Sequence, residues 1–273
     1  MEIIKTFKFL TLVLLGFFVV IYVLLISYVY FNQAGMIFQS ASLPKDYQFA
    51  YQQKFEELNI ESFDGVKLSG LLFKAEKAKG LIFYLHGNAG TLESWGNIAN
   101  IYTNLGYDIF ILDYRSFGKS EGEIENETQL NKDVSFVYRE LNKRYPENKI
   151  VIAGYSIGSG LATILAAENR PKALILQSPY YSFTELSGSR VPFFPDFMKN
   201  FHLETFSYIT KVKAPIYIFH GLEDQLISCS NSVRLNKLLD FKGHFCALKD
   251  QGHIGMNENE EFQSQLKKIL NKE

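Results

Sequence analysis

The sequence predicts an α/β fold, in which a mainly parallel sheet of about eight strands is flanked by helices and preceded by one apolar helix. From Glu56 onward, short apolar runs alternate with amphipathic segments of helical length, a pattern typical of strands and crossover helices. An uncharged apolar run, Phe9–Phe31, lies ahead of these segments. Hydrophobic residues make up 47% of the 273 residues, which is enough for one large core without stabilising metals or disulfides.

The apolar run predicts a membrane anchor. As a helix, its 23 residues would be about 34 Å long, enough to cross the hydrocarbon core of a bilayer. Tyr28 and Tyr30 stand where interfacial aromatic residues are common, and Lys5 and Lys8 flank the other end. We favour an uncleaved anchor over a signal peptide, whose apolar region usually has about 7–15 residues, and over a buried core helix.

The distribution of cations around this run predicts its orientation. Lys45 is the only cation in about twenty residues after the run, so the positive-inside rule places residues 1–8 in the cytoplasm and the rest of the chain outside. Residues 32–53 are expected to be a juxtamembrane linker, and residues 54–273 one domain. The chain is thus predicted to be a single-pass membrane protein with an extracytoplasmic domain.

The predicted sheet opens with a hairpin. Leu58–Ser62 and Val66–Phe73 flank the turn signal Asp64-Gly65, which favours antiparallel pairing. The later strands are short and apolar, as expected for strands buried on both faces. They are Leu81–Leu85, Tyr107–Leu112, Lys149–Ala153, Ala173–Gln177, Ile216–Phe219 and His244–Leu248.

Helices are expected in the gaps between these strands. They are Thr91–Leu105, Thr128–Arg144, Gly158–Glu168, Asn231–Leu239 and Glu260–Leu270. Residues 179–214 interrupt the alternation, contain three prolines and are too long for a plain connection, so we expect an inserted cap.

Gly154-Tyr155-Ser156-Ile157-Gly158 fits the G-x-S-x-G pattern, and it lies between a predicted buried strand and a predicted helix. A nucleophilic serine needs this context, because a sharp strand-to-helix turn exposes its hydroxyl above the sheet. Without that context the pattern would be a glycine-rich helix start. The position therefore predicts Ser156 as a nucleophile.

A nucleophilic serine needs a base and an acid, which in this arrangement follow it in the chain order Ser, Asp or Glu, His, each after a strand. His202, His220 and His244 are misplaced for the base, whereas His253 follows the last predicted strand. Two carboxylates, Glu223 and Asp224, compete for the role of acid after Ile216–Phe219.

The same chemistry needs two backbone N–H groups that stabilise the oxyanion. Ile157, the residue after the nucleophile, is expected to supply one. The loop His86-Gly87-Asn88-Ala89-Gly90 follows a predicted strand, and we expect its Asn88 to supply the other. Read alone, that loop would be a simple glycine turn.

Taken together, these motifs resemble the α/β-hydrolase superfamily, and within it the Bem46-like, ABHD13-like group of membrane-anchored serine hydrolases. The resemblance also includes Asp113–Gly122, Ser178-Pro179 and His220-Gly221. It implies the α/β-hydrolase fold and favours Asp224 over Glu223 as the acid. Ser116 departs from the glycine that the group usually carries, which leaves the geometry of that turn open.

The predicted function is hydrolysis of ester or thioester bonds of small or lipid-like acyl substrates through an acyl-enzyme on Ser156. The rivals are a peptidase of the same fold and a membrane-tethered binding protein without activity. Aromatic residues of the cap, with Tyr180, Phe193 and Phe194 foremost, are expected to line the acyl pocket, to pack on the domain or to touch lipid.

Neither a metal nor an organic cofactor is expected for this chemistry. The 28 Lys and Arg residues nearly balance the 29 Asp and Glu residues, which gives nucleic-acid binding no electrostatic support. Cys229 and Cys246 lack the spacing of a zinc site. They are expected to be two free thiols, with a disulfide as the alternative in an oxidising compartment.

Overall fold

The structure is a computed structural model and describes residues 2–240 and 243–271. In this part of the chain, eight strands form one sheet in the order β1-β2-β4-β3-β5-β6-β7-β8. The β1–β2 and β2–β4 pairs are antiparallel and the other pairs parallel, so the predicted opening hairpin and the predicted parallel sheet are both confirmed. The strands are β1 Phe55–Glu61, β2 Lys67–Phe73, β3 Leu81–Leu85, β4 Asp108–Leu112, β5 Ile150–Tyr155, β6 Ala173–Gln177, β7 Ile216–Gly221 and β8 His244–Leu248.

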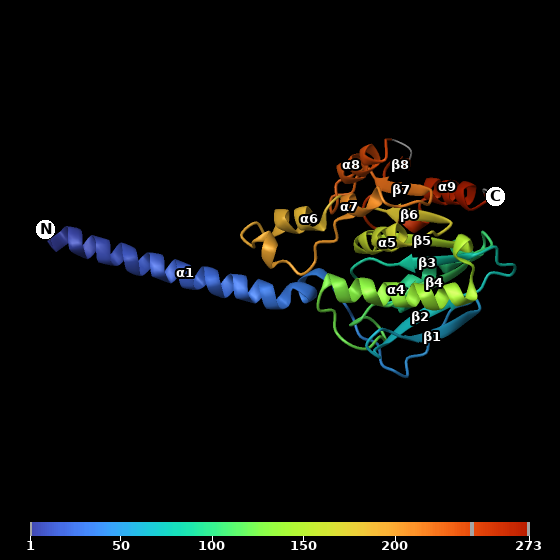
Figure 1. Cartoon of the computed structure of the whole chain (residues 1–273), viewed down its shortest axis with the longest axis horizontal. Coiled ribbons are helices and arrows are strands. Elements are labelled where there is room, and N and C mark those ends of the chain that lie inside the picture. The colour runs from blue at the N-terminus through green and yellow to red at the C-terminus, as the bar shows by residue number, and fades with distance from the viewer. Residues whose placement is uncertain (1, 241–242, 272–273) are drawn as a thin grey trace.

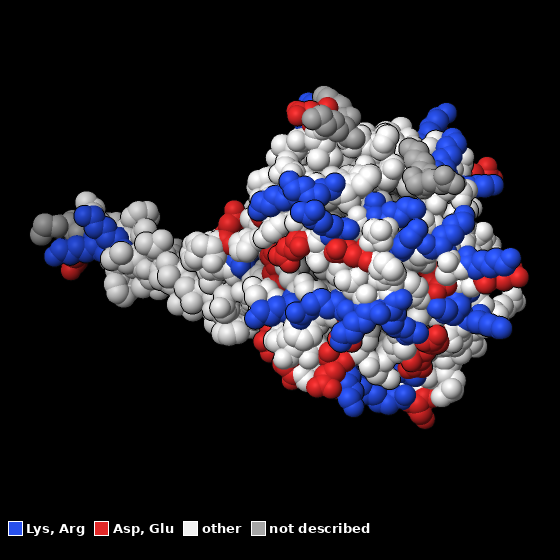
Figure 2. Space-filling view, turned by 45° about the vertical axis from the view of Figure 1, so that its right-hand side comes forward, with Lys and Arg blue, Asp and Glu red and all other residues white. Residues whose placement is uncertain are grey.

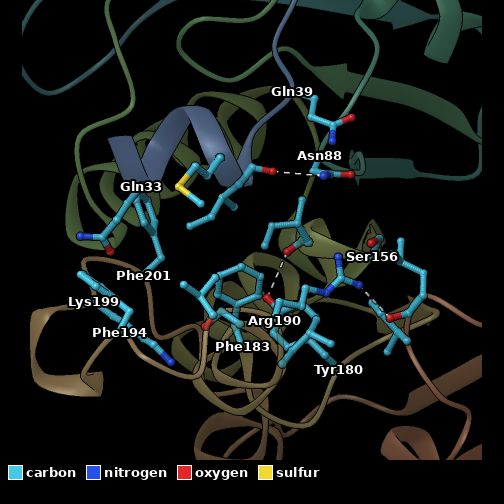
Figure 3. Close-up of a pocket in the computed structure, with 18 of the residues that line it drawn as sticks. Gln33, Gln39, Asn88, Ser156, Tyr180, Phe183, Arg190, Phe194, Lys199 and Phe201 are labelled. Carbon is cyan, nitrogen blue, oxygen red and sulfur yellow. Dashed lines mark hydrogen bonds between the residues drawn. The ribbon is translucent and has the colours of Figure 1, made fainter. Parts of the chain in front are cut away.

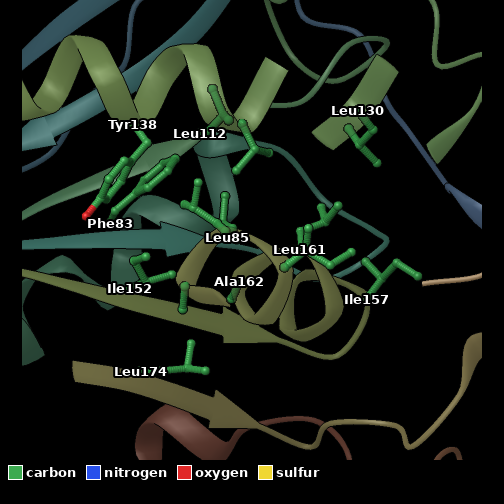
Figure 4. Close-up of a cluster of buried hydrophobic side chains, with 14 of the residues drawn as sticks. Phe83, Leu85, Leu112, Leu130, Tyr138, Ile152, Ile157, Leu161, Ala162 and Leu174 are labelled. Carbon is green, nitrogen blue, oxygen red and sulfur yellow. The ribbon is translucent and has the colours of Figure 1, made fainter. Parts of the chain in front are cut away.

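Helices cover both faces of the sheet (Figure 1). One face carries α4 Glu127–Arg144, α5 Ile157–Glu168, α7 Thr205–Ile209 and α8 Ser230–Leu238. The other carries α2 Leu92–Trp95, α3 Ala99–Thr103 and α9 Glu260–Leu270. Apolar side chains of α4 and α5 fill the space above the strands, with Leu161 beside Leu85 and Tyr138 beside Phe83 (Figure 4). This packing holds the carboxyl ends of the parallel strands at one edge of the sheet.

The predicted helix Thr91–Leu105 is wrong as one element. Thr91 caps α2, but the chain tightens into a 3₁₀ turn at Gly96–Ile98 before α3 begins. The hydroxyl of Tyr51 donates to the carbonyl of Glu93, and a Cβ on Gly96 would lie 2.4 Å from that hydroxyl oxygen. Tyr51 from the predicted linker therefore packs directly against Gly96, where the helix tightens.

The N-terminal helix α1, Glu2–Ile37, is longer than the predicted anchor 9–31 and continues into the predicted linker. It is long and apolar enough to cross a membrane. After it, Phe38 is buried against Phe117 and Phe201, and Leu43 donates its N–H to the carbonyl of Gly118. The remainder of the linker thus runs along the domain.

The structure answers two questions that the sequence left open, the geometry of the turn at Ser116 and the state of the two cysteines. Ser116 adopts a left-handed φ of 65°, and its hydroxyl donates to Glu123 and accepts from the N–H of Ile124, so hydrogen bonds hold the conformation that glycine adopts readily. Cys229 and Cys246 are free thiols.

The predicted insertion 179–214 lies between β6 and β7 and contains α6 Phe183–Arg190, a 3₁₀ turn at Asp196–Met198 and α7. We call its part before α7, residues 179–204, the cap. It extends away from the sheet along α1 (Figure 1).

Candidate active site

Ser156 lies in the sharp turn between β5 and α5, with φ 53° and ψ −119°. This conformation is unfavourable for a residue with a side chain, and the flanking glycines allow it. A Cβ on Gly158 would lie 2.1 Å from the carbonyl oxygen of Leu85, and one on Gly154 would lie 2.4 Å from that of Gly158. The G-x-S-x-G spacing thus reflects close contact between the helix and two strands.

Asp224 and His253 reach Ser156 from the loops that follow β7 and β8. The Nδ1 atom of His253 lies 2.7 Å from Oδ2 of Asp224, and its Nε2 atom lies 3.0 Å from Oγ of Ser156. Since a carboxylate only accepts hydrogen bonds, Nδ1 carries the proton and Nε2 is left to accept from the serine hydroxyl. The side chains of Ser156, His253 and Asp224 therefore form one hydrogen-bonded chain.

Asp224 is buried, whereas its competitor Glu223 is exposed. Burial opposes ionisation of Asp224, but hydrogen bonds from His220, His253 and the N–H of Ile227 outweigh it and hold the pKa of the carboxyl below its usual value. The carboxylate is thus charged at neutral pH and stabilises positive charge on His253.

His220 is a residue whose role sequence reasoning missed, because only the base was sought among the histidines. It is fully buried at the end of β7, and its Nε2 atom lies 2.7 Å from the carbonyl oxygen of Ile227 and 3.3 Å from Oδ2 of Asp224. Both neighbours are acceptors, so Nε2 carries the proton, while Nδ1 lies 2.7 Å from the hydroxyl of Ser232. His220 thus lies beside the carboxylate of Asp224 from inside the domain, and the available signal was its position at the end of an apolar strand.

The two residues expected to donate to the oxyanion, Ile157 and Asn88, line the same cavity as Ser156. Ile157 is the first residue of α5, where backbone N–H groups have no partner within the helix. Asn88 lies in the loop after β3; its carbonyl accepts from the N–H of Gln39, and its side-chain amide donates to the carbonyl of Ile37. The end of α1 therefore fixes the loop that carries Asn88.

A cavity of about 270 Å³ begins at Ser156. Figure 3 shows the last turns of α1 on one side of it and cap residues on the other. Helix α1 contributes Val29, Gln33, Met36 and Ile37. The contribution of α1 to the cavity was not predicted, because the predicted anchor and the domain were considered as separate parts.

The three expected pocket residues of the cap differ in their positions. Tyr180 and Phe194 line the cavity, and the Tyr180 hydroxyl donates to the carbonyl of Ile157. Phe193 is not among the lining residues; its side chain is 38% exposed, and its carbonyl accepts from the hydroxyl of Tyr22. Phe193 lies inside a turn, closed by the N–H of Phe194 donating to the carbonyl of Val191, and its side chain does not enter the cavity, so it was wrongly expected in the pocket.

The cavity's lining residues include two cations and no carboxylate. Lys199 is buried and donates to the carbonyl of Thr184, and Arg190 donates to that of Leu226. Within residues 2–240 and 243–271, no group of three or more His, Cys, Asp or Glu side chains is arranged to hold a metal ion.

The strand order, the sharp turn at Ser156 and the side chains of His253 and Asp224 beside it define an α/β hydrolase. The chain belongs to the α/β-hydrolase superfamily and is a hydrolase. The family model described as serine aminopeptidase, S33, matches residues 76–210. The resemblance to the Bem46-like, ABHD13-like group stays a prediction.

Curated relatives carry the same superfamily name. The chain is 29% identical over 241 residues to alpha/beta hydrolase domain-containing protein 17B of Homo sapiens, an alignment that covers 84% of the chain and 80% of the relative. It is 30% identical to protein 17C of Mus musculus, over 73% of the chain and 62% of the relative.

Solved structures support the fold. The Pyrococcus furiosus esterase Pf2001 matches with a TM-score of 0.68 and 19% identity, over 85% of the chain and 97% of the esterase. A puromycin-hydrolyzing peptidase of Mycobacterium tuberculosis matches with a TM-score of 0.67 and 14% identity, over 82% of the chain and 39% of the peptidase. At these identities, the two structures establish the fold alone.

Proposed function

We propose that this chain is a membrane-anchored serine hydrolase that cleaves ester or thioester bonds of lipid-like acyl substrates. The observation that carries the proposal is the hydrogen-bonded chain Ser156–His253–Asp224 at the foot of an apolar cavity. The alternatives are a peptidase of the same fold and a membrane-tethered binding protein without activity.

The reaction follows from the positions of the protons. His253 accepts the Ser156 proton at Nε2 as the serine oxygen attacks the acyl carbon, and Asp224 stabilises the imidazolium. The N–H groups of Ile157 and Asn88 are proposed to stabilise the oxyanion. The imidazolium then protonates the leaving alcohol or thiol, and water deacylates Ser156 by the same route, returning a carboxylic acid and the free serine.

The cavity's lining favours an acyl chain over a peptide N-terminus. An aminopeptidase needs an anionic group near the nucleophile to bind the substrate's ammonium, and the lining residues supply no carboxylate. Tyr180, Phe183 and Phe194 offer an apolar surface suited to methylene groups. An acyl ester or thioester is therefore the better candidate substrate.

Labelling with a fluorophosphonate probe tests the proposed nucleophile. Full-length protein in detergent should be labelled, and Ser156→Ala should abolish labelling and lower ester hydrolysis by about four orders of magnitude or more. Ser178→Ala is a matched control, because Ser178 is also buried with a positive φ at the end of the neighbouring strand.

The control variant should keep full labelling. If the Ser156→Ala variant were labelled to the same extent as the wild type, the mechanism would be refuted. A folded wild-type protein that neither reacts with the probe nor hydrolyses esters would favour the binding-protein alternative.

A further inference from the structure

The cap is attached to α1 at two levels along the helix. Near the end of α1, Nε2 of Gln33 donates to the carbonyl of Met198 at 3.0 Å, and Oε1 accepts from the N–H of Asn200 at 2.8 Å. Farther toward the N-terminus, the hydroxyl of Tyr22 donates to the carbonyl of Phe193 at 3.1 Å. Residues 191–197, which we call the cap tip, therefore lie alongside the apolar part of the helix.

The length of the helix sets the depth of the cap tip in a bilayer. Lys8 is the last charged residue before the apolar run, and Figure 2 shows uncharged helix between the N-terminal cations and the domain. A hydrocarbon core of about 30 Å takes up about 20 residues, which places its far boundary near Tyr28. Tyr22 lies about 9 Å of helix inside that boundary, and any tilt would place it deeper.

The surface of the cap tip suits such a position. Phe197 is 86% exposed and Phe193 is 38% exposed. An aromatic side chain that stays in water gains none of the favourable free energy of burying apolar surface. Asp196 is the only charged residue of the tip, and its carboxylate lies 2.6 Å from the ammonium of Lys199. A loop with two exposed aromatic rings and one paired charge fits the boundary between headgroups and acyl chains.

The cavity extends from the proposed nucleophile toward the same region. Its lining includes Val29 of α1, next to the expected boundary at Tyr28, and Val191 and Phe194 of the cap tip. Ser156 lines the side of the cavity opposite Gln33 of α1 (Figure 3). One apolar cavity thus connects the turn at Ser156 with the cap tip, which α1 brings to the lipid.

We propose that the cap tip is immersed in the leaflet next to the domain, and that the acyl chain enters the cavity from the lipid and not from water. This inference rests on the proposed membrane anchor and deepens the proposed function. It makes α1 a wall of the substrate pocket as well as an anchor.

Depth-dependent quenching tests the immersion without relying on catalysis. In a Cys229→Ser, Cys246→Ser background, Phe197→Cys is labelled with an environment-sensitive fluorophore, and the full chain is reconstituted in phosphatidylcholine vesicles containing lipids with a nitroxide either near the headgroup or deep in an acyl chain. Gly16→Cys reports insertion of α1 through the deep nitroxide, since nothing lies within 4 Å of that position. Lys267→Cys, an exposed position on α9 at the far end of the domain, is the unquenched control (Figure 1).

We expect the labels at 16 and 197 to be quenched and the label at 267 to be unaffected. Quenching at 16 without quenching at 197 would overturn the immersion and leave the anchor standing. Absence of quenching at both positions would overturn the anchor and, with it, this inference.

A kinetic measurement tests lipid entry separately. Phe197→Asp should lower turnover of a long-chain acyl ester embedded in vesicles by about tenfold, because a charge replaces an immersed ring, and should leave a water-soluble short ester unaffected. Equal turnover of the vesicle-borne ester by both proteins would contradict lipid entry. Loss of both activities would show that the change damages the domain, and the quenching result would then decide.

Discussion

At the scale of single residues, the acid of the proposed triad illustrates what chain order leaves open. Glu223 and Asp224 are neighbours after the same strand, and strand order does not distinguish them. Burial and hydrogen bonds do: Asp224 accepts from the N–H groups of Leu226 and Ile227 as well as from His253. The backbone of the turn thus holds one carboxylate in place and leaves the other in solvent.

A pair of isosteric variants tests this assignment. Asp224→Asn should lower kcat/KM for an ester by about three to four orders of magnitude, since His253 loses its charge partner and its correct tautomer. Glu223→Gln, adjacent and exposed, is the control and should stay close to the wild type. A crippled Glu223→Gln enzyme beside an active Asp224→Asn enzyme would reverse the assignment.

The same variant should alter the pH dependence of stability. The pKa of Asp224 is lowered in the folded chain, so its ionised form stabilises the fold above the unfolded-state pKa of about 3.9, and this contribution is lost as the pH falls through the folded pKa. Chemical unfolding of both proteins should therefore show their difference in unfolding free energy shrinking below about pH 4. A difference that grows toward acid pH would contradict the lowered pKa.

At the scale of elements, the unexpected contact is between α1 and the cap. Gln33 is 7% exposed and is the one polar side chain of α1 that lines the cavity. Its two hydrogen bonds to the cap backbone fix the helix in rotation, so that Val29 and Met36 face the cavity. The helix thereby forms one wall of the cavity, which we propose as the acyl pocket.

Filling the pocket from the helix side tests this role. Val29 is 5% exposed and lines the cavity, so Val29→Trp should shorten the longest acyl chain that the enzyme prefers. Each methylene that finds no room should cost up to about fourfold in kcat/KM. Initial rates on a series from acetyl to medium-chain esters measure the change.

Phe31→Trp is the matched control on the same helix, because Phe31 is 81% exposed and does not line the cavity. It should leave the chain-length profile unaltered. Identical profiles for Val29→Trp and the wild type would show that the helix does not bound the acyl chain.

At the scale of the whole molecule, α1 projects from a domain that is otherwise compactly packed around its sheet (Figure 1). Few of its residues are buried, Val29 and Gln33 among them, so most of its apolar surface is exposed, and the helix is long and apolar enough to cross a membrane. The predicted boundaries 1–8, 9–31, 32–53 and 54–273 stay a prediction, and α1 itself continues to Ile37.

Extraction and protease accessibility test the anchor and its orientation. Sodium carbonate should leave the full chain in the membrane fraction and detergent should release it, because a long apolar helix inserts essentially irreversibly. In sealed vesicles, protease added on the non-cytoplasmic side should digest the domain. Protection there, with digestion from the cytoplasmic side, would reverse the proposed orientation.

The sequence by itself determined the α/β class, the apolar helix and the positions of Ser156 and His253 at strand ends. Strand and helix periodicity, and the close contacts of glycines around a sharp turn, are encoded within a few neighbouring residues, so they can be read locally. For the same reason Glu260–Leu270 was predicted with its observed bounds.

Tertiary structure alone decided which side chains form the cavity. Phe194 lies in it and adjacent Phe193 does not, and Val29 of the anchor completes its wall. These positions depend on contacts such as that of Tyr22 with Phe193, which are 171 residues apart in the chain. Local periodicity carries no information on how two such segments meet, because their contact is set by packing and hydrogen bonding in the folded chain.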